Sequence, residues 1–255
     1  MIDYQVRDGV AEILFSNPPV NAITEAFMDA LLQALGRAHE DPATRAVILG
    51  SAIPGRFCAG LDLPAFLRGT PAEAHRIVGK IYARLSEAQS GLGKPSVAAV
   101  AGAARGAGMS IAITCDVILA ADDATFGYPE LEVGLLPAIH FHHLPRIVGR
   151  HRAFELLFTG RSFGAAEAVS LGLVSRHVPE AALMAEARRT AATFAAKSPE
   201  LMRLGKAAFL RAAAAGYREG AEAAVDLVST VFGTEDCREG LSAFAERRRP
   251  VWKGA

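Results

Sequence analysis

The sequence predicts an α/β protein, on the evidence of two patterns along the chain. Short apolar strand-type segments alternate with helical stretches, and glycine-containing turns follow several of the strands. Such alternation predicts parallel βαβ units, with the glycine turns at the carboxyl ends of the strands. From Arg150 onward the pattern is almost wholly helical and rich in alanine. We therefore predict an α/β core over residues 1–194 and a helical portion over residues 195–255.

The first elements have clear local signals. Residues 4–15 predict a β-hairpin with its turn at Asp8 and Gly9. A helix is expected from Thr24 to His39, because Thr24 is a good N-cap residue and the periodicity that follows is helical. Three short apolar runs predict buried strands, at residues 46–50, 96–102 and 116–121.

Composition indicates a globular protein of the reducing cytoplasm. The chain has 255 residues, 51% of them apolar, which is enough for a sizeable core. The formal net charge is zero, so charge favours neither a nucleic-acid nor a membrane-surface partner. The very apolar stretch over residues 97–121 contains Arg105, Asp116 and three glycines, which favours a buried segment over a membrane span. The cysteines are odd in number and scattered, which indicates free thiols: Cys58, Cys115 and Cys237.

The N-terminus has no basic start followed by an apolar core, and therefore no sign of a signal peptide. We expect a cytoplasmic location, without nucleic-acid or membrane partners.

A glycine-rich turn at residues 102–116 is the most informative feature of the sequence. Gly102, Gly106 and Gly108 come between a predicted strand and an apolar helix. Glycines allow close backbone packing, and they also allow another molecule to approach main-chain N–H groups. The turn therefore has two interpretations, one as a tight packing contact and one as a site for an anion or an oxyanion. The spacing matches neither GxxxxGK[ST] nor GxGxxG, which disfavours a nucleotide loop.

A second turn of this kind, RFCAGLDL at residues 56–63, follows the strand predicted at residues 46–50. Ala59 and Gly60 precede Asp62, which is a plausible N-cap for a helix that begins near Leu63. Two such turns can each direct one main-chain N–H into a common site. Two N–H donors are the minimum that holds a carbonyl oxygen as it becomes negative.

The chain resembles the crotonase, or enoyl-CoA hydratase/isomerase, superfamily over nearly its whole length. Six segments carry the resemblance in family order: NPPVNAIT, RFCAGLDL, KPSVAAVAGAARGAGMSIAITCD, FGYPELEVGLLP, FTGRSFGAAEAVSLGLVSRHV and FAERRRPVWKG. The resemblance implies a crotonase-like ββα spiral core with a C-terminal helical portion that builds trimers, or dimers of trimers. It also implies an acyl-coenzyme A substrate and no cofactor, because coenzyme A is part of the substrate.

By this resemblance the main-chain N–H groups of Ala59 and Gly106 form the oxyanion hole, and Glu130 is the catalytic base. Glu130 follows Pro129 among apolar residues, where partial desolvation raises the basicity of a carboxylate. Glu132 matches no family catalytic position and is expected to be a surface charge. The resemblance also implies contacts with the substrate along several segments: Ala22, Cys58, Leu61, Asp62, Leu63 and Pro129, with Arg248 and Lys253 near the coenzyme A phosphates.

The sequence departs from the hydratases at two places. Ser110 stands where they carry a second glutamate, and a serine is no base at neutral pH without an activating partner. PAIHFHHLPR replaces a glycine-rich helix start and brings in His140, His142 and His143. These histidines do not share one helix face and lack a nearby carboxylate or cysteine, so we expect no metal. His140 is either an acid or orienting group in the active site or a pocket-lining residue.

The expected reaction is the shift of a double bond in an enoyl-CoA, with one glutamate as the base. Hydration of a 2-enoyl-CoA, with Ser110 or His140 in place of the missing carboxylate, is the alternative. A non-catalytic acyl-CoA-binding subunit is a third interpretation. The acyl chain is not specified, because the residues of an apolar pocket resemble those of the core.

Overall fold

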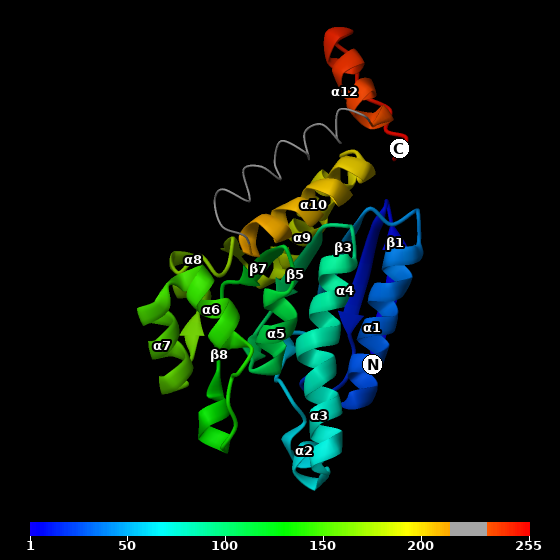
Figure 1. Cartoon of the computed structure of the whole chain (residues 1–255). Coiled ribbons are helices and arrows are strands. Elements are labelled where there is room, and N and C mark those ends of the chain that lie inside the picture. The colour runs from blue at the N-terminus through cyan, green and yellow to red at the C-terminus, as the bar shows by residue number, and fades with distance from the viewer. Residues whose placement is uncertain (215–233) are drawn as a thin grey trace.

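The computed structural model describes residues 1–214 and 234–255 and contains two β-sheets surrounded by helices (Figure 1). The larger sheet has six strands in the order β1-β2-β3-β5-β7-β10. Strands β1 and β2 are antiparallel, and every other neighbouring pair is parallel. The strands of this sheet are β1 Ile2–Arg7, β2 Val10–Phe15, β3 Ala46–Ser51, β5 Ser96–Val100, β7 Val117–Ala121 and β10 Arg176–Val178.

The smaller sheet has four short strands in the order β4-β6-β8-β9. The chain alternates between the two sheets, from β3 to β4, from β5 to β6 and from β7 to β8, and so winds as a spiral of ββα turns. This is the α/β spiral that the sequence predicts. The strands of the smaller sheet are β4 Arg56–Cys58, β6 Ala103–Arg105, β8 Thr125–Gly127 and β9 Phe163–Gly164.

Helices cover the sheets and follow the strand pairs. Two of the helical segments are not α-helical: η1 is a π-helix between α3 and α4, and η2 is a 3-10 helix. The helices up to α6 are α1 Glu25–Glu40, α2 Leu63–Arg68, α3 Pro71–Gly79, η1 Lys80–Arg84, α4 Leu85–Gly91, α5 Ala107–Ile113, η2 Pro129–Val133 and α6 His140–Val148. The later helices are α7 Arg150–Thr159, α8 Ala165–Ser170, α9 Glu180–Ala195, α10 Pro199–Ala214 and α12 Glu235–Ala245.

The local signals of the sequence are confirmed. Asp8 and Gly9 adopt positive φ angles of 49° and 75° in the turn between β1 and β2. The hydroxyl of Thr24 accepts a hydrogen bond from the N–H of Phe27 at the start of α1. Asp62 caps α2 in the same way, through the N–H of Ala65. All three predicted buried strands are present as β3, β5 and β7.

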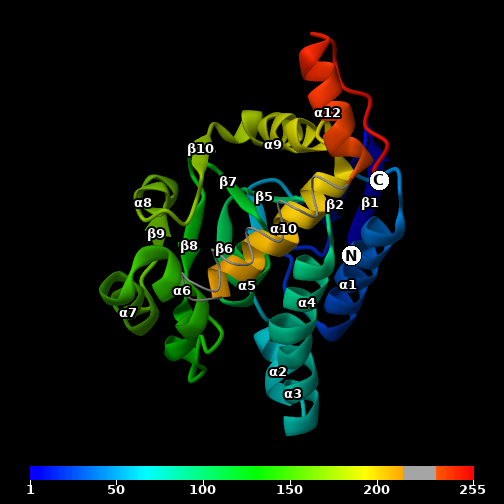
Figure 2. The same cartoon turned by 45° about the horizontal axis from the view of Figure 1, so that its top comes forward.

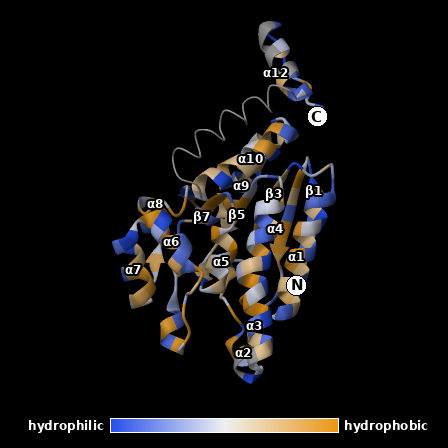
Figure 3. Cartoon of the chain, in the orientation of Figure 1, coloured by the Kyte–Doolittle hydropathy of each residue, from blue (hydrophilic) through white to orange (hydrophobic). Residues whose placement is uncertain are grey.

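Apolar side chains gather between the sheets and the helices. The central strands β5 and β7 are coloured mostly as hydrophobic, whereas the outer helices alternate between hydrophobic and hydrophilic faces (Figure 3). Phe15, Phe27 and Phe57 form an aromatic cluster in this core, with ring centroids 5.4 and 5.3 Å from Phe15. No helix of the described chain is long and apolar enough to cross a membrane.

The C-terminal helices are fixed to the core by specific polar contacts. Helix α9 packs on β3, β5 and β7. Helix α10 contacts α4 and α12, and in the view of Figure 2 it crosses in front of α5. The ammonium group of Lys206, on α10, lies 2.8 Å from the carboxylate of Asp116 and donates to the carbonyl of Lys94. Helix α9 ends at Ala195, next to the predicted boundary. The division into two domains and the trimer stay predictions.

The two glycine turns are in main-chain contact. A Cβ atom on Gly108 would lie 2.4 Å from the carbonyl oxygen of Cys58, and one on Gly60 would lie 2.8 Å from the carbonyl oxygen of Arg105. Atoms at such distances overlap, so a side chain at either position requires the backbone to move. The packing interpretation of the glycines therefore holds, and this packing brings the turn at residues 56–63 against the start of α5.

We predict that Gly108→Ala lowers the free energy of unfolding by about 3 kcal/mol or more, because the new methyl group overlaps main-chain atoms that cannot rotate away. Chemical denaturation of the purified variant measures this loss. Gly36→Ala is the matched control: it lies within α1 with open space around its Cα, so alanine should be neutral or stabilise by about 0.5–1 kcal/mol. A Gly108→Ala protein as stable as wild type would contradict the account.

Candidate active site

A cavity of about 260 Å³ lies where the two glycine turns meet. The turn at residues 59–63, the junction of β6 and α5 at residues 105–107, and the segment at residues 129–138 form three of its walls. Helices α2 and η1 and the end of α3 supply a largely apolar fourth wall: Phe66, Val78, Ile81 and Tyr82. The cavity thus combines exposed main chain with an apolar lining.

Glu130 lies on η2 and lines this cavity. Burial raises the pKa of its carboxyl group above the ordinary value of 4.5. Its Oε2 atom is buried and has no hydrogen-bond partner among the described residues. Gly106 is its close neighbour, because a Cβ atom there would lie 3.2 Å from Oε1. The carboxylate predicted as the base is therefore at the glycine turn and in an environment that increases its basicity.

The predicted oxyanion donors need correction. The N–H of Ala59 donates to the carbonyl of Val20, and the N–H of Gly106 donates to the carbonyl of Gly127, each at 3.1 Å. Both N–H groups are thus occupied by main-chain hydrogen bonds. The two N–H groups predicted as oxyanion donors are therefore not free in this structure, and an oxyanion site at the two turns stays a prediction.

Two neighbouring N–H groups are free. The carbonyl of Gly60 and the N–H of Asp62 both bond to Ile23, so the N–H of Leu61 between them points away from Ile23. Ala107 is the first residue of α5, where an N–H has no partner within the helix. Within residues 1–214 and 234–255, neither the Leu61 nor the Ala107 N–H has a hydrogen-bond acceptor.

These two free groups belong to adjacent turns. A Cβ atom on Gly60 would lie 3.6 Å from the nitrogen of Ala107, and Gly60, Leu61 and Ala107 all line the cavity. The pair of free donors is thus on the same cavity as Glu130.

Ser110 and His140 lie together, but outside the cavity lining. The hydroxyl of Ser110 is 3.1 Å from Nε2 of His140, and both side chains are buried. Burial, with a smaller effect of His143, lowers the pKa of His140 to about 3, so its ring is neutral at physiological pH. The ring packs against Tyr128, with centroids 4.6 Å apart. The pair is a neutral buried unit, which does not fit the prediction that either residue reacts with substrate.

Helix α6 begins at His140, and the described residues contain no group of three or more side chains suited to hold a metal ion.

The predicted substrate-binding residues divide into two groups. Leu61, Leu63 and Pro129 line the cavity. Three others do not: Cys58 is fully buried, Asp62 caps α2, and the carbonyl of Ala22 accepts a hydrogen bond from the side chain of Asn17. Burial raises the pKa of the Cys58 thiol to about 12, which makes it a filler rather than a nucleophile. Contacts of Ala22, Cys58 and Asp62 with substrate stay predictions.

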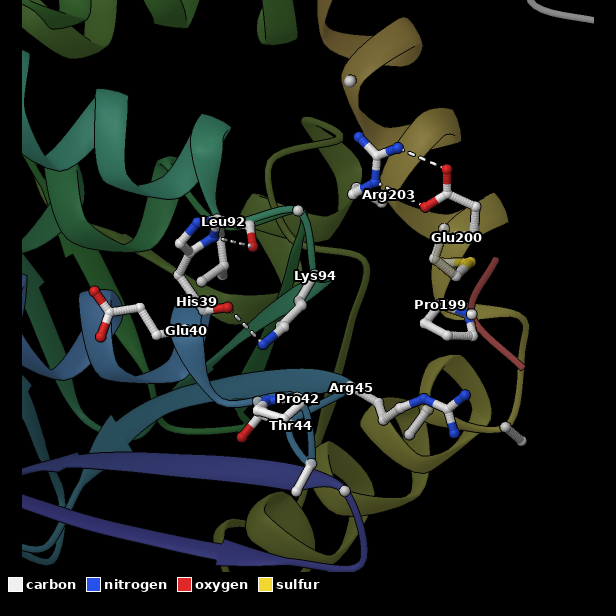
Figure 4. A pocket seen from close by; sticks show the side chains of 18 of the residues that line it. His39, Glu40, Pro42, Thr44, Arg45, Leu92, Lys94, Pro199, Glu200 and Arg203 are labelled. Carbon is white, nitrogen blue, oxygen red and sulfur yellow. Dashed lines mark hydrogen bonds and ion pairs between the residues drawn. The ribbon is translucent and has the colours of Figure 1, made fainter. Parts of the chain in front are cut away.

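The predicted phosphate-binding cations lie elsewhere in this chain. Lys253 lines a separate cleft of about 1150 Å³, whose lining also includes Glu40, Arg45 and Glu200 (Figure 4). Neither Arg248 nor Lys253 lines the Glu130 cavity. Arg248 forms ion pairs with Glu239 and Glu246, and Lys253 forms one with Glu235. Their role toward coenzyme A stays a prediction.

Sequence reasoning did not single out Tyr82, the one phenol among the described residues that line the cavity. It lies on η1, where the long helical run from α3 to α4 changes to π-helical geometry. Such π-helical turns are rare and frequently occur at functional sites. No motif marks the position, because the periodicity of residues 71–91 is that of an ordinary amphipathic helix.

Comparison with known proteins gives a consistent result. The family model for enoyl-CoA hydratase/isomerase matches residues 5–255. A probable enoyl-CoA hydratase of Mycobacterium bovis is 38% identical over 96% of this chain and 95% of its own length. A probable enoyl-CoA hydratase of Bacillus subtilis is 34% identical over 99% of this chain and 98% of its own.

The fold is shared as well. The crystal structure of an enoyl-CoA hydratase from Bacillus anthracis superposes with a TM-score of 0.95 at 32% identity, over 100% of this chain and 99% of that chain. The resemblance carried by the six sequence segments is thereby confirmed. The chain belongs to the enoyl-CoA hydratase/isomerase family and has the crotonase fold.

Proposed function

We propose that this protein is an enoyl-CoA isomerase that uses Glu130 as its single acid–base group. The observation that carries the proposal is that a half-buried Glu130 lines the same cavity as two free N–H groups. By the family resemblance, Ser110 occupies the position of the second glutamate. A double-bond shift needs one group that removes a proton and returns it, whereas hydration also needs a held water.

The steps follow from this arrangement. The Glu130 carboxylate removes a proton from C2 of a 3-enoyl-CoA, and the electron pair of that C–H bond moves into a dienolate with charge on the thioester oxygen. The N–H groups of Leu61 and Ala107 donate hydrogen bonds to this oxygen. Protonated Glu130 then gives the proton to C4, which leaves a 2-enoyl-CoA and restores the carboxylate.

Hydration of a 2-enoyl-CoA is the second candidate, because the relatives are named as hydratases. Loss of one general acid–base group typically costs roughly 10²–10⁴-fold in rate. We therefore propose that isomerisation is the faster reaction. An acyl-CoA substrate, no separate cofactor, a cytoplasmic location and a homotrimer or dimer of trimers are parts of the same proposal.

Glu130→Gln should lower kcat for isomerisation of a 3-enoyl-CoA by roughly 10²-fold or more, because the amide cannot accept the proton. Binding of the acyl-CoA should persist, as measured by calorimetry with an unreactive saturated acyl-CoA. Glu132→Gln is the matched control, since Glu132 is an exposed carboxylate on the same 3-10 helix. Turnover of Glu130→Gln within a few-fold of wild type would remove Glu130 from the mechanism.

The pH dependence of kcat/KM should show an acidic limb caused by Glu130. A base works only when deprotonated, so activity is complete above its pKa and is lost as the pH falls through it. Because burial raises this pKa, the limb should lie above the ordinary value of 4.5. Steady-state rates from pH 4 to 9 measure it, and a limb at or below 4.5 would argue against a desolvated base.

Ala107→Pro should lower kcat by roughly 10²–10³-fold, because proline removes the N–H proposed to bind the oxyanion. Proline is sterically suited to the first position of a helix, so the change tests the donor rather than the fold. Ala107→Gly retains the N–H and provides the comparison; the additional loss caused by proline is the readout. Equal rates for the two variants, with both folded by circular dichroism, would exclude this donor.

A further inference from the structure

The lining of the cavity includes a phenol, Tyr82, to which the proposed isomerisation assigns no task. Of the described residues that line it, four have polar side chains: Tyr82, Arg105, Glu130 and Glu132. The guanidinium of Arg105 donates to the carbonyl and hydroxyl of Thr125 and is held on β8. The Oε1 atom of Glu132 lies beside Gly160, where a Cβ atom would be 3.5 Å away. Glu130 and Tyr82 remain as the groups available to a substrate.

Tyr82 is placed in an otherwise apolar wall. Its neighbours in the lining on the same helical run are Val78 and Ile81, with Phe66 from α2. The side chain is half-buried, and its hydroxyl lies near the main chain of Ile139. Tyr82 thus adds a hydroxyl group, which can donate a hydrogen bond, to an otherwise apolar wall.

The two groups interact electrostatically across the cavity. Burial, and then the negative charge of Glu130, raise the pKa of the Tyr82 phenol, so that it stays protonated at physiological pH. Glu130 offers the complementary atom, since Oε2 is buried and unpartnered among the described residues. A donor and an acceptor that share a small cavity can both bind one water molecule.

We propose that Tyr82 is a second catalytic residue, and that its hydroxyl and Oε2 of Glu130 together hold a water molecule that the protein adds to 2-enoyl-CoA thioesters. This hydration rests on the proposed function, since it uses the same base and the same oxyanion donors. Tyr82 thereby takes over the water-orienting task of the carboxylate that Ser110 replaces.

The chemistry balances without another reactant. Tyr82 donates its O–H to the water oxygen, and the water donates one O–H to Oε2 of Glu130. The water oxygen forms a bond to C3 as Glu130 takes that proton, and the π electrons of the C2–C3 bond move to give an enolate on the thioester oxygen. Protonated Glu130 then transfers the proton to C2, which gives a 3-hydroxyacyl-CoA and the original carboxylate.

The Ser110–His140 pair is not an equivalent source of this activity. Neither side chain lines the cavity, and the two are bonded to each other at 3.1 Å in the buried layer behind it.

Tyr82→Phe tests the proposal, because it removes the hydroxyl and retains the ring. Wild type should hydrate trans-2-hexenoyl-CoA more slowly than it isomerises trans-3-hexenoyl-CoA. In Tyr82→Phe, kcat for hydration should fall roughly 10²-fold while kcat for isomerisation stays within a few-fold. Product analysis in H₂¹⁸O should place the label on C3 of the hydroxyacyl product.

Tyr4→Phe is the matched control, because Tyr4 is a partly buried tyrosine with an unpartnered hydroxyl outside the cavity lining. Equal loss of both reactions in Tyr82→Phe, no loss of either, or a wild type that isomerises without hydrating would each overturn the role of Tyr82. The proposed isomerisation fails on a different result, a wild type without activity on trans-3-hexenoyl-CoA or a Glu130→Gln protein that retains it. Thermal unfolding of all variants identifies any loss that comes from misfolding.

Discussion

The main-chain contact between the two glycine turns is the constraint on which the rest of the site depends. Gly108 lies against the carbonyl of Cys58, and Gly60 lies against the carbonyl of Arg105, at distances that leave no room for a Cβ atom. Because the two backbones touch, Leu61 and Ala107 are brought to one cavity from different strands of the smaller sheet. The packing and the functional interpretations of the glycines are therefore compatible, because the close packing of the two turns is what makes the two free N–H groups neighbours.

The sequence predicted what depends on local chemistry and on family motifs. The hairpin at Asp8 and Gly9, the cap at Thr24 and the place of Glu130 all follow from patterns within a few residues. The proposed oxyanion donors differ from the predicted ones, with Leu61 in place of Ala59 and Ala107 in place of Gly106. Their assignment depends on which N–H groups already donate to carbonyl groups of other segments, those of Val20 and Gly127. Such long-range pairing cannot be inferred from the motif.

Tyr82 and His140 also show that side-chain placement is hard to predict from sequence: a motif drew attention to His140, which does not line the cavity, whereas no motif marked Tyr82, which does. His140 attracted attention as one of three clustered histidines, yet it is buried behind the cavity with Ser110, and burial keeps its ring neutral. Tyr82 belongs to no motif, yet it lines the cavity from the π-helical segment η1. A titratable residue is thus a poor guide to function until its burial and its direction are known.

The π-helical turn at Lys80–Arg84 also has a consequence for how such a protein can diversify. A π-turn is equivalent to one extra residue in an α-helix, and one residue corresponds to about 100° of rotation. Deleting a single residue there would return the run to a regular helix and rotate Tyr82 relative to one of its flanking segments, without touching the base or the glycine turns. One deletion could thus replace the polar side chain of this wall with an apolar one. The preference between hydration and isomerisation would then change because the helix is rotated, and not because a residue of the cavity is substituted.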